Sequence, residues 1–360
     1  MLIVILVIIG LSFLILGHEA GHFFAAKMFG LKVDEFGFGF PPRITAWRPK
    51  NSETEYSINW LPFGGFVRIA GERGEFEGIS PEGGGAAGAG AGKNDAPADS
   101  KRLLLSQPPW KKSIIMLAGV FMNFILGWLL FAAVLMVGTP QAVIITGTQA
   151  HSPAATAGIQ AGDVLKGYTN TQSFINYVDA HKGQPITVTV TRNAKDISFT
   201  ITPRVNPGPD QGALGVELEQ GGSAREPFFI ALWQGLQSAA LLSWLTVQAF
   251  GNLIAQIFAH ATLPAGVVGP VGIFGIAEET GKIGLAYLLQ FLGIISINLM
   301  VVNLIPFPAL DGGRFLMVII EKVKGSALPY KFEAWVNGIG FALLIALMIA
   351  LTVRDVGALL

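Results

Sequence analysis

The chain has 360 residues, of which 51% are hydrophobic and only 13% are charged, and its mean hydropathy is +0.54. This composition predicts a membrane protein. Twenty-four basic and twenty-four acidic residues give zero net charge, which provides no reason to expect nucleic acid as a partner. The sequence has no cysteine, so disulfides and thiolate metal ligands are excluded and a metal would be held by histidine and carboxylate side chains.

The first predicted element is a membrane-spanning helix in residues 1–30, whose apolar run begins at Leu2 and reaches His18 without a charged side chain. No basic segment precedes this run and no small-residue cleavage site follows it, so we expect an uncleaved span and not a signal peptide. The loop after the span is rich in lysine and arginine. By the positive-inside rule this loop lies in the cytoplasm and the N-terminus lies outside.

The end of this span carries the motif HExxH, from His18 to His22. Residues four apart lie on one face of a helix, so both imidazoles can direct a nitrogen to one zinc ion, with Glu19 beside it. A carboxylate in that place removes a proton from water and later passes it to a leaving amine. An ordinary helix surface is the weaker interpretation, because three ionisable groups would be costly in lipid without a compensating role.

Residues 31–112 are predicted to form a β region beside the membrane, followed by a flexible insert. Short alternating segments such as 56–60 and 66–69, punctuated by proline and glycine, predict strands or hairpins. A sheet edge here could hold an extended substrate by strand addition, and a plain connecting hairpin is an equally good interpretation. The side chains assigned to substrate binding in this region are Tyr56, Ile58, Phe66 and Val67.

The insert, from Glu82 to Ser100, is rich in glycine and alanine and has too few large apolar residues to fold. We expect it to carry no chemistry. A second span is predicted over residues 113–137. On one of its faces Gly119 permits a close helix approach, and Asn123 would need a hydrogen-bond partner. Simple packing and a place at the active site both fit this pair, and Asn123 is assigned to substrate binding.

Residues 142–218 have the composition of a soluble segment and are long enough for one small α+β domain, with strands expected at 143–146, 186–191 and 197–202. The segment from Ser152 to Leu165 resembles the SPAxxAGLxxGD signature of bacterial PDZ domains. The two histidines of this part of the chain, His151 and His181, are expected to lie on the surface and not to bind metal.

Residues 228–258 are apolar and helical in pattern, but polar side chains such as Gln248 and Asn252 interrupt them. A third span is predicted within residues 285–320, and the sequence NLIPFPALDGG ends it. Two prolines spaced by one residue stop the helix, and an aspartate with two glycines begins a tight turn in an apolar region. This turn makes Asp311 the candidate third metal ligand, although Asp-Gly-Gly is also common turn chemistry.

The number of crossings follows from the depth of these groups. His18 lies roughly 25 Å along a hydrocarbon core about 30 Å thick, so the HExxH motif lies toward the cytoplasmic side. The second span returns outward, and the third brings Asp311 to the same side. If residues 228–258 also crossed, Asp311 would lie too far from the histidines for a metal bond of about 2 Å. We therefore expect that segment to be interfacial or re-entrant, with a fourth span at residues 335–353.

These motifs together resemble a known family. HExxH in the first span, GPVGIF before the third span and NLIPFPALDGG at its end are similar to the site-2 protease family of intramembrane zinc metalloproteases. The single PDZ-like domain resembles the bacterial branch of the regulator-of-sigma-E protease. The resemblance covers nearly the whole chain, and the pairing of HExxH with NxxPxPxLDG is highly specific. The Gly/Ala-rich insert departs from the family pattern but touches no motif.

The resemblance implies specific roles for the motif residues. Zn²⁺ would be bound by His18, His22 and Asp311, with Glu19 as the catalytic acid and base. It also implies that Asn303 lies near the substrate carbonyl, where it could hydrogen-bond the developing oxyanion. A membrane-embedded β-hairpin is implied after the first span, and the alternating segments described above match it.

The predicted fold is thus a mainly α-helical membrane protein with four transmembrane helices, a membrane-associated β-hairpin region and one extracytoplasmic PDZ-like α+β domain. Its expected location is the bacterial inner membrane, with several crossings and an active site toward the cytoplasm. The expected partners are single-span membrane protein substrates, the lipid bilayer and peptide termini at the PDZ domain. Anti-sigma factors or remnant signal peptides would be suitable substrates for such regulated intramembrane proteolysis.

Two functions from different classes fit the sequence. The favoured one is an endopeptidase that cuts transmembrane helices, with the PDZ domain screening substrates that have lost a bulky outer domain. The alternative is a catalytically inactive membrane PDZ adaptor with a structural metal site. A metal transporter fits less well, because it needs polar sites along a path and the ionisable residues here gather at one depth.

Overall fold

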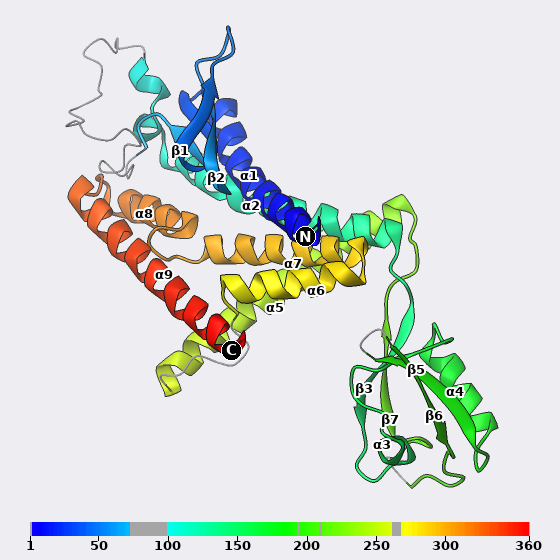
Figure 1. Cartoon of the computed structure of the whole chain (residues 1–360). Helices are drawn as coiled ribbons and strands as arrows, with labels where there is room; N and C mark the ends of the chain where they lie inside the picture. Colours follow the sequence, from blue (N-terminus) through cyan, green and yellow to red (C-terminus); the bar gives the residue numbers. More distant parts are fainter. Residues whose placement is uncertain (1, 73–98, 193–194, 209–210, 261–267, 360) are drawn as a thin grey trace. The chain divides into compact units, whose positions relative to one another are not determined.

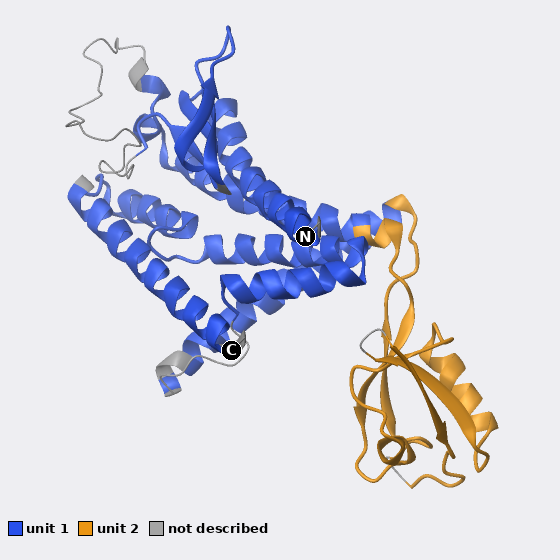
Figure 2. Cartoon of the chain, in the orientation of Figure 1, with its two compact units in different colours: residues 1–133, 229–360 blue, residues 134–228 orange. Residues whose placement is uncertain are grey.

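The computed structural model describes residues 2–72, 99–192, 195–208, 211–260 and 268–359. The chain divides into two compact units (Figure 1, Figure 2), which are described separately. Unit 1 consists of Met1–Ala133 and Phe229–Leu360, and unit 2 consists of Val134–Phe228. The predicted insert from Glu82 lies outside the described residues up to residue 98, and a short 3₁₀ helix, η1, follows at Asp99–Arg102.

Unit 1 is mainly helical. Five helices are long and apolar enough to cross a membrane in the part of the chain that the structure describes. These are α1 (Leu2–Met28), α2 (Pro109–Val137), α5 (Phe228–His260), α7 (Leu285–Leu304) and α9 (Tyr330–Leu359). Two shorter helices, α6 (Pro270–Ile283) and α8 (Asp311–Lys324), precede and follow α7. The predicted membrane protein is therefore confirmed in its broad class, with five candidate spans where the sequence predicts four.

Helix α5 lies beside α2 and α7. Near its start, the Leu232 carbonyl accepts a 2.8 Å hydrogen bond from the Trp128 indole at the end of α2. Further along, Thr246 donates a 3.0 Å hydrogen bond to Asn298, which lies in the last third of α7. Because α7 also begins beside the end of α2, where Phe131 packs against Gly293, α5 and α7 run in the same direction.

Helix α6 then runs back along α1. Ala277 packs in one apolar cluster with Val7, and a side chain at Gly281 would collide with Ile3 near the start of α1. Because α6 runs back in this way, α7 begins at the same end of unit 1 as α1. The sequence argument against a crossing at residues 228–258 took no account of a helix such as α6 between α5 and α7. The interfacial or re-entrant placement of this segment stays a prediction.

The β region expected after the first span is present as β1 (Val33–Trp47) and β2 (Glu55–Ile69). The first half of β1 lies between the two halves of β2, so that Phe36 pairs with both Val67 and Tyr56. Glu35, which is 3% exposed, accepts hydrogen bonds from Arg43 at 2.8 Å and Arg68 at 3.1 Å. A carboxylate buried between two guanidinium groups ties the first half of β1 to the segments on both of its sides.

Unit 2 is a small α+β fold. Its sheet has the order β6-β5-β4-β3-β7. The strands are β3 (Ala142–Thr148), β4 (Val164–Leu165), β5 (Ile186–Arg192), β6 (Lys195–Ile201) and β7 (Val216–Gly221), and the helices are α3 (Pro153–Ala157) and α4 (Thr171–Ala180). Alternating side chains of β3 and β5 are buried, which is the pattern of strands with one face on a core.

The PDZ-like signature occupies defined places in unit 2. Ser152 caps α3 by accepting a 3.1 Å hydrogen bond from the Ala155 backbone N–H, and Gly158 ends the helix with a φ of 92°. The fully buried Asp163 accepts hydrogen bonds from Arg192 at 2.6 and 2.7 Å. The metal-ligand group found in the described ranges does not include His151 or His181, and their surface role stays a prediction.

Candidate metal centre

Helix α1 presents the two histidines of HExxH to α2. A side chain added at Gly119 of α2 would place its Cβ 2.3 Å from His22 Nε2 and 2.7 Å from His18 Cε1. On the α1 side, a Cβ at Gly21 would lie 2.4 Å from the Ala118 carbonyl oxygen. Each helix therefore needs a glycine at this crossing, and the close approach expected at Gly119 is present against the metal-ligand face.

The third ligand comes from the turn between α7 and α8. Asp311 is the first residue of α8, directly after the segment that contains Pro306 and Pro308. A Cβ at Gly312 would lie 2.3 Å from the Leu304 carbonyl oxygen, and one at Gly313 would lie 2.1 Å from that of Phe307. The two glycines of the LDGG sequence are thus required for the start of α8 to fold back on the end of α7.

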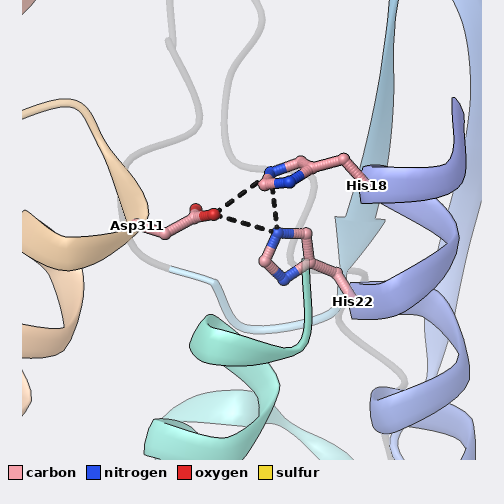
Figure 3. Close-up of side chains that lie close together, drawn as sticks. All are labelled: His18, His22 and Asp311. Atoms are coloured by element: carbon pink, nitrogen blue, oxygen red, sulfur yellow. Dashed lines mark hydrogen bonds and ion pairs between the residues drawn. The ribbon is translucent and has the colours of Figure 1, made fainter. Parts of the chain in front are cut away.

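Figure 3 shows the three side chains pointing toward one another from α1 and α8. Asp311 Oδ2 lies 3.1 Å from His18 Nε2 and 3.3 Å from His22 Nε2, and the two nitrogens are 3.3 Å apart. Tetrahedral zinc ligands at bond lengths of about 2.0–2.1 Å are separated by about 3.3 Å. The triangle therefore has the dimensions of one face of a zinc coordination tetrahedron.

The chemistry of this group also fits a cation. Asp311 Oδ2 is buried, and apart from the two imidazole nitrogens it has no polar partner among the described residues; such an atom needs a positive charge or a donor. In the ranges that the structure describes, His18, His22 and Asp311 form the one cluster of this kind. The residues present are thus suited to hold a metal ion.

Contacts with α2 orient both imidazoles. His22 Nδ1 lies 2.8 Å from the Ile115 carbonyl oxygen, to which it donates, and this leaves Nε2 free as a ligand. His18 Nδ1 lies 3.2 Å from the amide of Asn123, a fully buried side chain whose Oδ1 has no partner in the described part of the chain. Rotating this amide by half a turn would let Oδ1 accept from His18 Nδ1–H. This position behind His18 favours an orienting role for Asn123 over the predicted substrate contact.

The sheet lies next to Glu19. A Cβ added at Gly65 of β2 would stand 3.3 Å from Glu19 Cγ, so this strand passes directly beside the predicted acid and base of HExxH. Phe66 and Val67 follow in the half of β2 that pairs with β1 on one side. These two predicted substrate-binding residues therefore belong to an edge of the sheet.

Tyr56 and Ile58 are placed differently from Phe66 and Val67. Ile58 pairs with both Phe38 and Thr45, so its strand has a neighbour on each side and offers no free edge. Tyr56 stacks on Trp47 with ring centroids 5.9 Å apart. These two residues lie inside the sheet, which does not favour backbone pairing with a substrate there. Asn303 lies in the last turn of α7 and is partly buried.

Sequence reasoning missed Arg314 and Glu72, which form an ion pair between α8 and the end of the sheet. The pair connects the helix that begins with Asp311 to the segment just after β2. Sequence offers one signal for it, because a charged residue so close to an apolar span needs a partner. Its partner could not be named from sequence, since Glu72 is far from Arg314 in the chain.

Comparison with known proteins identifies the family. The sequence profile of peptidase family M50 matches residues 6–347. The chain belongs to peptidase family M50. A Clostridium perfringens protein, named only provisionally as a zinc metalloprotease, is 32% identical to this M50 member over 98% of each chain. The zinc metalloprotease RasP of Geobacillus kaustophilus is 31% identical over 95% of each chain, and the regulator of sigma-W protease RasP of Bacillus subtilis is 28% identical over 98% of each.

Family M50 is the site-2 protease family, so the predicted family is confirmed. The matched region includes both HExxH and the LDGG turn, and this M50 member is therefore a metalloprotease, as predicted. The prediction of zinc agrees with the names of the relatives, and the prediction of a multi-pass membrane protein agrees with the apolar helices. The similarity to the sigma-E branch and the PDZ assignment of unit 2 stay predictions.

Proposed function

We propose that this M50 member is an intramembrane zinc endopeptidase that cleaves transmembrane segments of other membrane proteins. The observation that carries this proposal is the ligand triangle formed by His18 and His22 of the apolar helix α1 and by Asp311, which follows the apolar helix α7. A soluble substrate would have little access to a peptidase centre within the membrane. Peptide bonds that are themselves in the membrane are the substrates that can reach it.

The residues around the triangle divide the chemical work. His18, His22 and Asp311 would hold a zinc ion, which would supply Lewis-acid chemistry at the scissile carbonyl. Glu19 accepts a proton from the attacking water and delivers it to the leaving amine nitrogen. The Asn303 amide donates a hydrogen bond to the carbonyl oxygen as negative charge develops on it. Asn123 and the Ile115 carbonyl keep the two imidazoles turned with Nε2 toward the metal.

A peptide bond inside a helix is shielded by its own hydrogen bonds, so the substrate must unwind locally before it is cut. The β2 segment from Gly65 to Ile69 supplies backbone groups that can pair with the unwound strand. Its closeness to Glu19 supports this assignment, because a strand paired there would pass the catalytic carboxylate. Phe66 and Val67 then contact the substrate, and Tyr56 and Ile58 support the sheet.

We assign unit 2 to substrate screening outside the membrane, where it binds peptide termini or blocks bulky outer domains. The proposed location is the bacterial inner membrane with the metal centre toward the cytoplasm. Anti-sigma factors and remnant signal peptides are the proposed substrates. The name of the Bacillus subtilis relative, a regulator of sigma-W protease, supports a regulatory role of this kind.

The variant Glu19→Gln tests the proposal. It removes the proton acceptor but keeps the size of the side chain and all three metal ligands. We expect purified protein in lipid nanodiscs to retain one zinc and to lose cleavage of a single-span substrate by at least about 100-fold. A panel of single-span membrane proteins is incubated with the wild type and with the variant, each with and without a chelator. Cleavage at the wild-type rate by the variant would refute the proposed mechanism.

The alternative, a membrane adaptor with a structural metal, makes a different prediction. His22→Ala would then leave the cellular response that depends on this protein unchanged, as long as the chain is still inserted and folded. If the protein is an endopeptidase, the same variant would lose the metal and the cellular response would be abolished.

A further inference from the structure

Helix α9 contacts the loop that carries Asp311. The Oδ1 atom of Asn337 accepts a 3.1 Å hydrogen bond from the backbone N–H of Ala309. One turn further along α9, a Cβ at Gly340 would stand 2.5 Å from Pro308 Cβ and 2.7 Å from the Pro308 carbonyl oxygen. The backbone of α9 therefore lies directly against the loop, and this close approach is possible because residue 340 is a glycine.

The loop needs such support at this point. Ala309 has a φ of 72°, in the left-handed region that a residue with a Cβ rarely adopts. A conformation of this kind persists when its surroundings hold it, and the hydrogen bond to Asn337 is made by this same residue. Since Ala309 lies two residues before Asp311, a change of its backbone angles would move the carboxylate.

The contact lies in the part of α9 that is at least partly buried. Residues 341–350 of α9 are exposed apart from Leu344, so the helix does not pack closely on unit 1 through its middle. Further on, Asp355 accepts hydrogen bonds from the backbone of Gly269 and Gly272 at the start of α6. Near the metal centre, α9 contacts the ligand loop through Asn337 and Gly340.

We propose that Asn337 is a positioning residue for the metal ligand Asp311. By holding Ala309 in its left-handed conformation, it keeps Asp311 Oδ2 at 3.1 and 3.3 Å from the two imidazole nitrogens. Gly340 serves the same purpose by allowing α9 to approach Pro308. The inference rests on the ligand set of the proposed function. It assigns α9 a role in metal binding, although α9 contains neither HExxH nor the LDGG turn.

The test measures zinc affinity of the full chain in detergent by competition with a chromophoric chelator. Asn337→Ala and Gly340→Ala are each expected to weaken zinc binding about tenfold, the usual effect of removing a group that supports a ligand. Gly338→Ala is the matched control, because a Cβ at that position of the same helix meets nothing within 4 Å. Its zinc affinity should equal that of the wild type.

A merely structural role is separated by thermal unfolding of the metal-free protein. A positioning role predicts that Asn337→Ala changes zinc affinity while the unfolding midpoint of the metal-free form stays near that of the wild type. Wild-type zinc affinity in both Asn337→Ala and Gly340→Ala would overturn the inference, as would a lowered metal-free midpoint with unchanged affinity. If Asp311→Asn also bound zinc as the wild type does, the ligand set and the proposed function would fail instead.

Discussion

Gly119 is a residue at which the metal centre has no room for a side chain. Its position on α2 brings backbone, with no side chain between, against both imidazoles of α1. A methyl group there would occupy the space of His22 Nε2 and His18 Cε1, so the helices would have to separate or the rings would have to rotate. Either response moves a ligand atom by more than a metal bond tolerates.

We expect Gly119→Ala to abolish zinc binding and to lower the free energy of unfolding by about 1–3 kcal/mol. The matched control is Gly251→Ala on α5, where an added Cβ meets nothing within 4 Å, and it should bind zinc normally. Zinc content after gel filtration and chemical denaturation of both variants would check this. A Gly119→Ala protein with a full zinc complement would show that the crossing of α1 and α2 accommodates a side chain at this position.

Among the elements, the residue before β4 and the last residue of β5 in unit 2 are joined by an ion pair whose carboxylate is buried. Two hydrogen bonds from the Arg192 guanidinium, at the end of β5, hold the pKa of Asp163 below its ordinary value. The carboxylate is fully buried and also accepts a hydrogen bond from the Gln160 backbone N–H. The pair thus fastens the loop of the SPAxxAGLxxGD signature to the sheet.

The lowered pKa fixes the direction of the pH dependence. The folded form of unit 2 binds the Asp163 proton less readily than the unfolded form, so this stabilisation is present above pH of about 4 and is lost as pH falls through the lower, folded pKa. Asp163→Asn should remove this dependence and destabilise unit 2 by about 1–3 kcal/mol at neutral pH.

Hydrogen exchange of β5 peptides in the full chain, corrected for intrinsic rates at each pH, is the appropriate measurement. Helix α1 serves as the internal reference, since its protection should not respond to this substitution. Equal protection of β5 in wild type and Asp163→Asn at pH 7 would contradict the prediction.

At the scale of the whole molecule, the path of α5 decides how many times the chain crosses the membrane. A crossing α5, followed by the return of α6, places Phe229 and Gln256 on opposite sides. An interfacial α5 would leave both on one side. Because the sequence has no cysteine, single cysteines can be introduced at these two exposed positions without a background signal.

We expect an impermeant maleimide to label Phe229→Cys from the outside of intact cells and Gln256→Cys only after the membrane is opened. Asp179→Cys in unit 2 and Lys50→Cys after β1 serve as the reference positions for the two sides. Labelling of both α5 positions in intact cells would restore the four-span topology.

The parts of this molecule that sequence predicts are those fixed by local rules. Helical periodicity alone places His18 and His22 on one face, and the glycines after Asp311 predict the tight turn. The double pairing of β1, the return of α6 and the contact of Asn337 with Ala309 could not be read in this way. Each of these features depends on contacts between segments that are far apart in the chain. The local sequence of one segment does not indicate which other segment it contacts.

The ligand triangle also has a consequence for biosynthesis. His18 and His22 are translated with the first helix, whereas Asp311 is translated only after most of the chain. A chain that ends before Asp311 would lack the proposed third ligand and, with it, the proposed proteolytic activity.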